Sequence, residues 1–322
     1  MAANAAELQR ARSKPGPVAP AIQETEEELL LLSSFGDKGG STKSFTLRLL
    51  AALLIKRWGK DKVKLIDGDG AVNSLWRYYR HAELFSFHGA LDERDKLVNV
   101  LLGDKAPLVV ADMPATTITK LREISEEYNF LDAVRQAGYR MTLLEPITPY
   151  PEPTMDLQEV IRLFEPEAFA AFREIYVSFP ELVRASEVNA DENSTAEQVE
   201  FARQPVRARL AEIDAAFRKG AVKKTRANYV AALNLGYQAE GIEDFVDWNA
   251  PEAFTRRLLA FVGGVEIRIP KLRMRIASRL HAKRKSFYEG AQILSITDRS
   301  RLATFLEEAE AAFAPAAEWL GL

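Results

Sequence analysis

The chain has 322 residues, 47% of them hydrophobic and 28% charged, with a formal net charge of −3. This composition is typical of a globular protein with one large α/β domain or two small ones. Because the chain has no cysteine, disulfides, thiolate metal sites and cysteine nucleophiles are excluded. No apolar run approaches the ~20 residues of a membrane-spanning helix, and residues 1–28 lack the apolar core of a signal peptide. The expected location is therefore the cytoplasm.

Residues 1–28 are rich in Ala, Pro and Gln, and we expect a flexible extension without chemistry. From residue 29 onward, short apolar runs alternate with segments of helical periodicity. The expected strands are 29–35, 63–66, 108–111, 141–144, 229–233 and 265–269. The expected helices are 44–57, 91–102, 120–137, 251–262, a basic helix after Pro270, and 300–313.

Continuous apolar strands separated by helices predict an α/β fold, with a mostly parallel sheet and helices on both faces. Four prolines between residues 146 and 153 interrupt this alternation and begin a long polar, helical stretch. We therefore expect one domain over 29–322 with a helical insertion at about 150–227.

A phosphate-binding loop is predicted at 36–44, Gly-Asp-Lys-Gly-Gly-Ser-Thr-Lys-Ser, between an expected strand and an expected helix. Glycines let backbone N–H groups surround a polyphosphate, and the helix N-terminus adds partial positive charge. Lys43 would neutralise the β- and γ-phosphates of ATP, and Ser44 would bind Mg²⁺. The predicted contacts to ATP are Gly39, Gly40, Ser41, Thr42, Lys43 and Ser44.

The loop departs from the pattern G-x-x-x-x-G-K-[ST], because Asp37 and Thr42 replace its glycines. It instead fits K-G-G-x-x-K-[ST] and so resembles the deviant Walker A motif of the ParA/MinD family of P-loop ATPases. The resemblance covers about 29–145 and 228–315. It implies a P-loop NTPase fold in which Lys38 reaches the partner's phosphates across an ATP-dependent homodimer. Segments 233–236 and 266–272 are also similar to plasmid-borne members of the StbB and TraL type.

Acidic residues follow two expected strands, at the edge where open α/β sheets bind ligands. By resemblance, Asp69 of the Asp-Gly-Asp segment orients or deprotonates the attacking water, while Asp67 helps to place the Mg²⁺ shell. Asp112 would hold Mg²⁺ through water. Asn234 and Pro270 follow two later strands, at the places where this family holds the adenine.

Relatives that bind iron–sulfur clusters or use thiolates are excluded by the lack of cysteine. The segment 300–313 combines an apolar side with Glu307, Glu308 and Glu310, so we do not expect membrane targeting like that of MinD.

The segment 268–285 holds eight Lys/Arg and no acid, so a body of net charge −11 carries a segment of +8. Within it, helical spacing predicts an apolar row of Leu272, Ile276 and Leu280, and a basic stripe of Arg275, Arg279 and Lys283. Such a stripe can bind DNA phosphates without reading sequence. The alternative is a solvated face whose charges pair with the acidic body.

These features predict a cytoplasmic or nucleoid-associated ATPase whose ATP-bound dimer binds nonspecific DNA and a partner protein that stimulates hydrolysis. The expected role is partition or positioning of a plasmid or chromosome. One alternative is a non-hydrolysing, nucleotide-dependent scaffold for conjugation or mobilisation machinery. Another is a metabolic P-loop ligase, a class that lacks the signature lysine represented here by Lys38.

Overall fold

The computed structural model describes residues 29–37, 42–70, 72–86, 96–127, 129–176, 225–235, 241–249 and 253–322, with isolated positions between 195 and 239. The predicted extension 1–28 lies outside the described residues. So do Lys38, Gly39, Gly40 and Ser41 of the phosphate loop, and most of the predicted insertion.

The core of the fold is a seven-stranded, all-parallel sheet with the order β3-β2-β4-β1-β5-β6-β7. The strands are β1 (Leu29–Ser34), β2 (Val63–Asp67), β3 (Glu83–Leu84), β4 (Leu108–Asp112), β5 (Tyr139–Ile147), β6 (Asn228–Asn234) and β7 (Val265–Ile269). The predicted α/β class with a parallel sheet is confirmed. Strand β5 is longer than expected, and the two-residue edge strand β3 was not predicted.

The helices are α1 (Lys43–Trp58), α3 (Lys96–Asp104), α4 (Thr117–Glu127), α5 (Phe130–Gln136), α6 (Pro151–Phe164), α7 (Pro166–Tyr176), α10 (Val246–Asn249), α11 (Phe254–Phe261), α12 (Met274–Lys283), α13 (Ile296–Phe313) and α14 (Ala317–Leu320). The prediction of one helix over 120–137 was wrong, because Asn129 starts a second helix there. Its side chain accepts a hydrogen bond from the backbone N–H of Asp132 at 3.3 Å and so caps α5.

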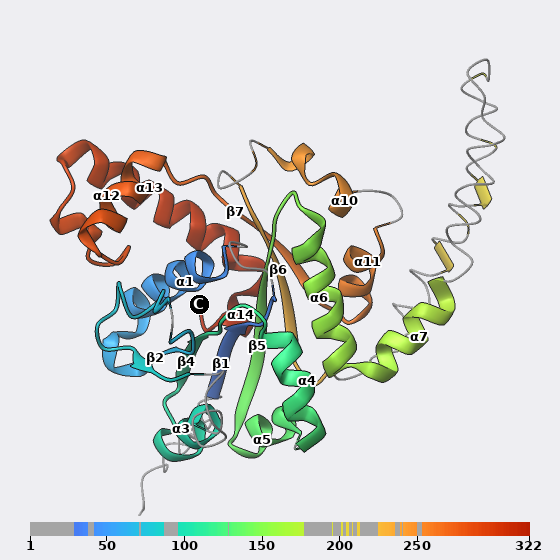
Figure 1. Ribbon diagram of the computed structural model, residues 1–322. Coiled ribbons are helices and arrows are strands. Elements are labelled where there is room, and N and C mark those ends of the chain that lie inside the picture. Colours follow the sequence, from blue (N-terminus) through green and yellow to red (C-terminus); the bar gives the residue numbers. More distant parts are fainter. Residues whose placement is uncertain are drawn as a thin grey trace, which may run out of the picture.

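Helices cover both faces of the sheet, as expected for strands that are apolar throughout (Figure 1). Successive side chains of β1 alternate between the two faces. Leu31 belongs to the core layer that includes residues of α4, α5, α6 and α11, whereas Leu30 and Leu32 belong to the layer that includes residues of α1, α12 and α13. The apolar side of α13, including Phe305 and Phe313, is buried in this second layer.

A buried carboxylate fixes the point where the chain returns to the sheet after residues 177–224. Glu165 lies between α6 and α7 and accepts hydrogen bonds from the backbone N–H groups of Arg226 (2.5 Å) and Ala227 (3.3 Å). It also accepts one from the Tyr229 hydroxyl at 3.0 Å. The start of β6 is therefore held beside the end of α6.

Candidate nucleotide-binding site

The register of three neighbouring strands brings polar residues together at the carboxyl ends of these strands. Strand β4 lies between β1 and β2, and Asp112 is paired with Ser34 on one side and with Asp67 on the other. Both aspartates are buried. Helix α1 begins with Lys43 and Ser44 after the loop that follows β1, so the predicted cation and the strand-end carboxylates meet here.

Asp112 is a buried carboxylate with unused acceptor capacity. Neither of its oxygens has a hydrogen-bond partner among the described residues. Burial raises its pKa to about 7, while the nearby Ser44 hydroxyl, Arg48 and Lys43 act in the opposite direction. A buried acid whose oxygens are not saturated by hydrogen-bond donors is suited to receive a hydrated cation.

This burial predicts a pH-dependent effect of Asp112→Asn on stability. Folding raises the pKa of Asp112 from 3.8 to about 7, so the folded state binds this proton more tightly than the unfolded chain does. The stability that the bound proton contributes is lost as the pH rises through about 7. The asparagine variant, free of nucleotide and metal, should therefore gain in Tm over the parent between pH 5 and pH 8. The gain corresponds to roughly 2–3 kcal/mol, from about 1.4 kcal/mol per pKa unit. Calorimetry in EDTA measures it, with exposed Asp61→Asn as control, and a pH-independent difference would contradict it.

Asp67 organises the loop that carries Asp69. One carboxylate oxygen accepts hydrogen bonds from the backbone N–H groups of Leu75 and Trp76, both at 2.8 Å, and the other accepts from Asp69 at 3.1 Å. Asp69 is half-buried, and its own carboxylate accepts from the backbone N–H of Val72 at 3.1 Å. Asp67 thus directs its oxygens mainly to the backbone of this loop.

Lys43 is almost fully buried among carboxylates. Burial lowers the pKa of its ammonium group, and the carboxylates of Glu145, Asp156, Asp112 and Asp37 oppose that shift. Glu145 and Asp156 were not predicted as site residues. Their proximity means that the charge of Lys43 is electrostatically compensated within the protein.

Glu145 holds the strand that leads into the phosphate loop. It lies on β5 and accepts hydrogen bonds from the backbone N–H of Phe35 (2.5 Å) and the hydroxyl of Ser34 (3.0 Å). Burial raises its pKa to about 7. The sequence signal that could have found it is a carboxylate directly after the apolar pair Leu143–Leu144.

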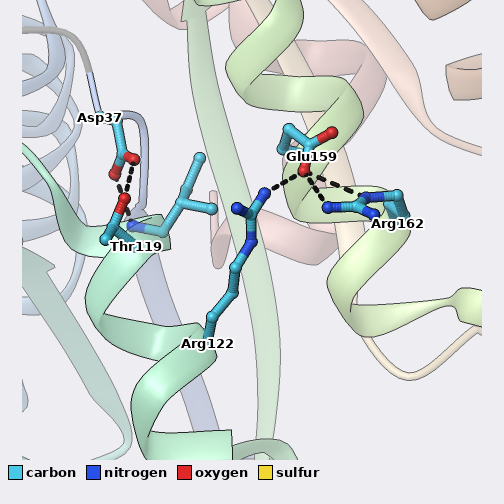
Figure 2. A network of polar contacts seen from close by, with 6 residues as sticks. Asp37, Thr119, Arg122, Glu159 and Arg162 are labelled. Carbon is cyan, nitrogen blue, oxygen red and sulfur yellow. Dashed lines mark hydrogen bonds and ion pairs between the residues drawn. The ribbon is translucent and has the colours of Figure 1, made fainter.

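Asp37, which departs from the standard loop pattern, caps helix α4 (Figure 2). Its carboxylate accepts hydrogen bonds from the backbone N–H of Ile118 at 2.7 Å and from the Thr119 hydroxyl at 2.8 Å. Its carbonyl accepts from the backbone N–H of Thr116 at 3.2 Å. A carboxylate at a helix N-terminus satisfies free N–H groups and complements the helix dipole.

A second contact continues from α4 to α6 (Figure 2). Arg122 of α4 forms an ion pair with Glu159 of α6, which also pairs with Arg162 at 2.6 Å. The phosphate loop is therefore joined to α4, and α4 to α6, by side-chain contacts.

Thr42 explains the second departure from the standard pattern. It has a φ of 70°, a left-handed conformation in which glycine is favoured. Its hydroxyl accepts a hydrogen bond from the side-chain amide of Asn234 at 3.1 Å. Asn234, predicted to hold adenine, thus ties the end of β6 to the end of the phosphate loop.

A cavity of about 300 Å³ lies beside the start of α1. It is lined by Phe45, Arg48, Tyr78, Asn234, Leu235, Leu272, Met274, Ala277, Ser278, Leu280, His281, Lys285, Ser286 and Phe287. The Arg48 guanidinium lies 3.9 Å from the centroid of the Tyr78 ring. A hydrogen bond of 2.6 Å joins the Tyr78 hydroxyl to Nδ1 of His281. Pro270 follows β7 but does not line this cavity.

The basic stripe has an acidic partner for two of its three members. Arg279 and Arg275 pair with the buried carboxylate of Asp298, on α13, at 2.6 and 3.4 Å. Lys283 is exposed and forms no ion pair within the described part of the chain. The alternative of pairing with the acidic body therefore describes Arg275 and Arg279 but not Lys283.

Together these features define an α/β protein with a seven-stranded, all-parallel sheet and a polar site at the carboxyl ends of its strands. No protein-family model matches the chain, and no curated protein matches it. Among solved structures, the MinC:MinD cell division protein complex of Aquifex aeolicus is similar over 88% of this chain and 96% of that chain. The identity is 12% and the TM-score is 0.35, values at which the likeness carries no argument about function. Within the described residues, no helix is long and apolar enough to cross a membrane.

Proposed function

We propose that this protein is a ParA/MinD-like ATPase that binds Mg·ATP at the start of α1 and forms an ATP-dependent homodimer. The observation that carries the proposal is the buried Asp112 carboxylate, which has unused acceptor capacity beside Lys43 and Ser44. A cation bridge to a polyphosphate is the ligand chemistry that such a trio supports best.

The geometry supports a division of roles among the site residues. Lys43 would exchange its carboxylate neighbours for the β- and γ-phosphates, and Ser44 with Asp112 would hold Mg²⁺. Asp67 is given a positioning role, because its oxygens accept three backbone hydrogen bonds. Asp69, at the half-buried tip of the same loop, would orient the attacking water.

The adenine would occupy the 300 Å³ cavity, whose size is at the lower end of small-ligand pockets. Its aromatic residues, Phe45, Tyr78 and Phe287, provide apolar surfaces for a flat base. Asn234 lines the cavity while contacting Thr42, so one residue would link the base to the phosphate loop.

The remaining roles follow from the family resemblance of the loop. Lys38 would act on the partner's phosphates, and Gly39, Gly40 and Ser41 would surround the phosphates of the same protomer. The ATP-bound dimer would bind DNA without sequence preference and a partner protein that stimulates hydrolysis. Release on hydrolysis would then serve partition or positioning of a plasmid or chromosome.

The test is ATP-dependent binding to unrelated DNA duplexes, measured by fluorescence anisotropy at several salt concentrations. With ATP, affinity should be about equal for all sequences, because phosphates rather than bases are contacted. If a dimer neutralises about six phosphates, log affinity should fall with log salt at a slope of roughly −5. A flat salt response, or binding that ignores ATP, would remove DNA from the proposal.

A further inference from the structure

A second hollow, of about 440 Å³, opens beside the carboxyl end of α12. It is lined by Ile55, Lys60, Tyr78, Tyr79, Arg80, His81, Lys283, Arg284, Lys285, Ser286, Tyr288 and Glu289. We call it the basic hollow. It shares Tyr78, Lys285 and Ser286 with the 300 Å³ cavity, so the two adjoin.

The basic hollow gathers positive charge that is not compensated within the described residues. Glu289 is the one carboxylate among the described residues that line it, and it pairs with Lys285 at 3.6 Å. Within the described residues, no ion pair is formed by the other cations of the hollow, which are Lys60, Arg80, Lys283 and Arg284. Like charges held close together repel one another unless an anion joins them.

The position of these cations is not explained by the helix alone. Lys283 and Arg284 lie where the dipole of α12 favours positive charge. Lys60 precedes β2 and Arg80 follows it, so both enter the hollow from another part of the fold. The hollow shares Lys283 with the basic stripe but not Arg275 or Arg279, whose charges are paired with Asp298.

Arg284 keeps its side chain at a position that favours glycine. It ends α12 with a φ of 50°, and the next backbone N–H, of Lys285, donates to the carbonyl of Leu280 at 3.0 Å. Helices that end in this left-handed conformation usually carry glycine. The arginine is therefore conformationally unfavourable here, yet it lines the hollow.

Aromatic side chains border the same charges. Tyr288 lines the hollow and is 56% exposed, which leaves its ring accessible. The Arg80 guanidinium lies 3.9 Å from the centroid of the Trp76 ring, which restrains it. The hollow therefore combines an accessible aromatic ring with cations, which bind nucleic-acid phosphates.

We propose that the basic hollow, rather than the stripe of Arg275 and Arg279, binds the phosphate groups of DNA. This inference rests on the proposed function, whose DNA-binding surface it names. One wall of the hollow, residues 78–81, continues the loop whose backbone Asp67 holds. That connection provides a route by which bound nucleotide alters the hollow.

The test compares three variants, each of which is first shown to be folded and to bind ATP with the affinity of the parent. The hollow variant carries Lys60→Glu, Arg80→Glu and Arg284→Glu, and the charge-matched control carries Lys105→Glu, Arg135→Glu and Arg173→Glu at exposed sites elsewhere. A third variant carries Arg275→Gln and Arg279→Gln.

With ATP, the hollow variant should lose about 100-fold or more in DNA affinity and most of its salt slope. The other two should stay within about threefold of the parent. DNA binding by the hollow variant like that of the parent would overturn the inference.

The single change Arg284→Gly guards against misfolding as an explanation. Tm should stay unchanged or rise, because glycine relieves the left-handed conformation. The salt slope should nevertheless become shallower by about 1 for each phosphate that the variant no longer neutralises. An unchanged slope would contradict phosphate binding by Arg284.

A parent protein that binds no DNA with ATP would refute the DNA part of the proposed function. The hollow is then judged by pyrophosphate titration of the Lys43→Ala variant, in which the nucleotide site is disabled. Pyrophosphate binding that disappears on adding the three hollow changes would assign the site to small phosphorylated ligands and overturn its assignment to DNA. Absence of any pyrophosphate binding would refute the hollow as a phosphate site.

Discussion

Replacing Lys43 with alanine should abolish measurable ATP binding, with an affinity loss of at least about 100-fold. The ammonium group is buried and would be the main charge facing the phosphates. Its removal also leaves Glu145 and Asp156 without their compensating cation, so the site would repel a polyphosphate. Titration calorimetry with Mg·ATP measures the effect directly.

The matched control for this change is Lys56→Ala, on the same helix. Lys56 is exposed and pairs with Glu310 at 3.0 Å, far from the strand ends, so ATP affinity should stay within about threefold of the parent. Circular dichroism establishes that both variants are folded. If Lys43→Ala binds ATP as the parent does, the phosphate loop is assigned to the wrong segment.

Replacing Asp69 with alanine should leave ATP binding within about threefold but slow hydrolysis by about 100-fold or more. The reason is that orienting the attacking water matters in the transition state and little in the ground state. Because hydrolysis would end the ATP-bound state, the variant should accumulate as a dimer. Phosphate release and light scattering measure the two effects, with exposed Asp61→Ala as control.

The same background tests the signature lysine. Adding Lys38→Ala to Asp69→Ala should give a protein that binds ATP yet remains monomeric, since the missing ammonium would act across the interface. A persistent dimer would reject that role for Lys38. If Asp69→Ala hydrolyses ATP at the parent's rate, another residue orients the attacking water. If the parent does not hydrolyse ATP even with DNA and the partner protein present, the scaffold alternative is favoured.

Six of the seven strands were predictable because each contains a local apolar pattern that both layers of helices bury, whereas the exposed strand β3 has no such pattern. Strand β7 occupies the predicted residues 265–269. The predicted strand that corresponds to β5 ends too early, at Leu144, because the next residue, Glu145, is charged. Only the fold supplies the donors of Ser34 and Phe35 that satisfy its buried carboxylate.

The site was predictable where its residues lie in a short motif. Lys43, Ser44 and Asp112 come from the phosphate loop and a strand end, and the sheet register brings the strand ends together. The contact of Asn234 with Thr42 and the pairing of Arg279 with Asp298 depend on how distant elements pack. Residues 60, 80 and 284 of the basic hollow are likewise brought together only by the folded chain.

The hydrogen bond between Tyr78 and His281 has a thermodynamic consequence. It joins α12 to the loop that Asp67 holds, so one element contacts both proposed ligand sites. Linkage between two sites is reciprocal: the factor by which ATP strengthens DNA binding is the factor by which DNA strengthens ATP binding. Copies of the protein on DNA would therefore bind ATP more tightly than free copies, and by that same factor.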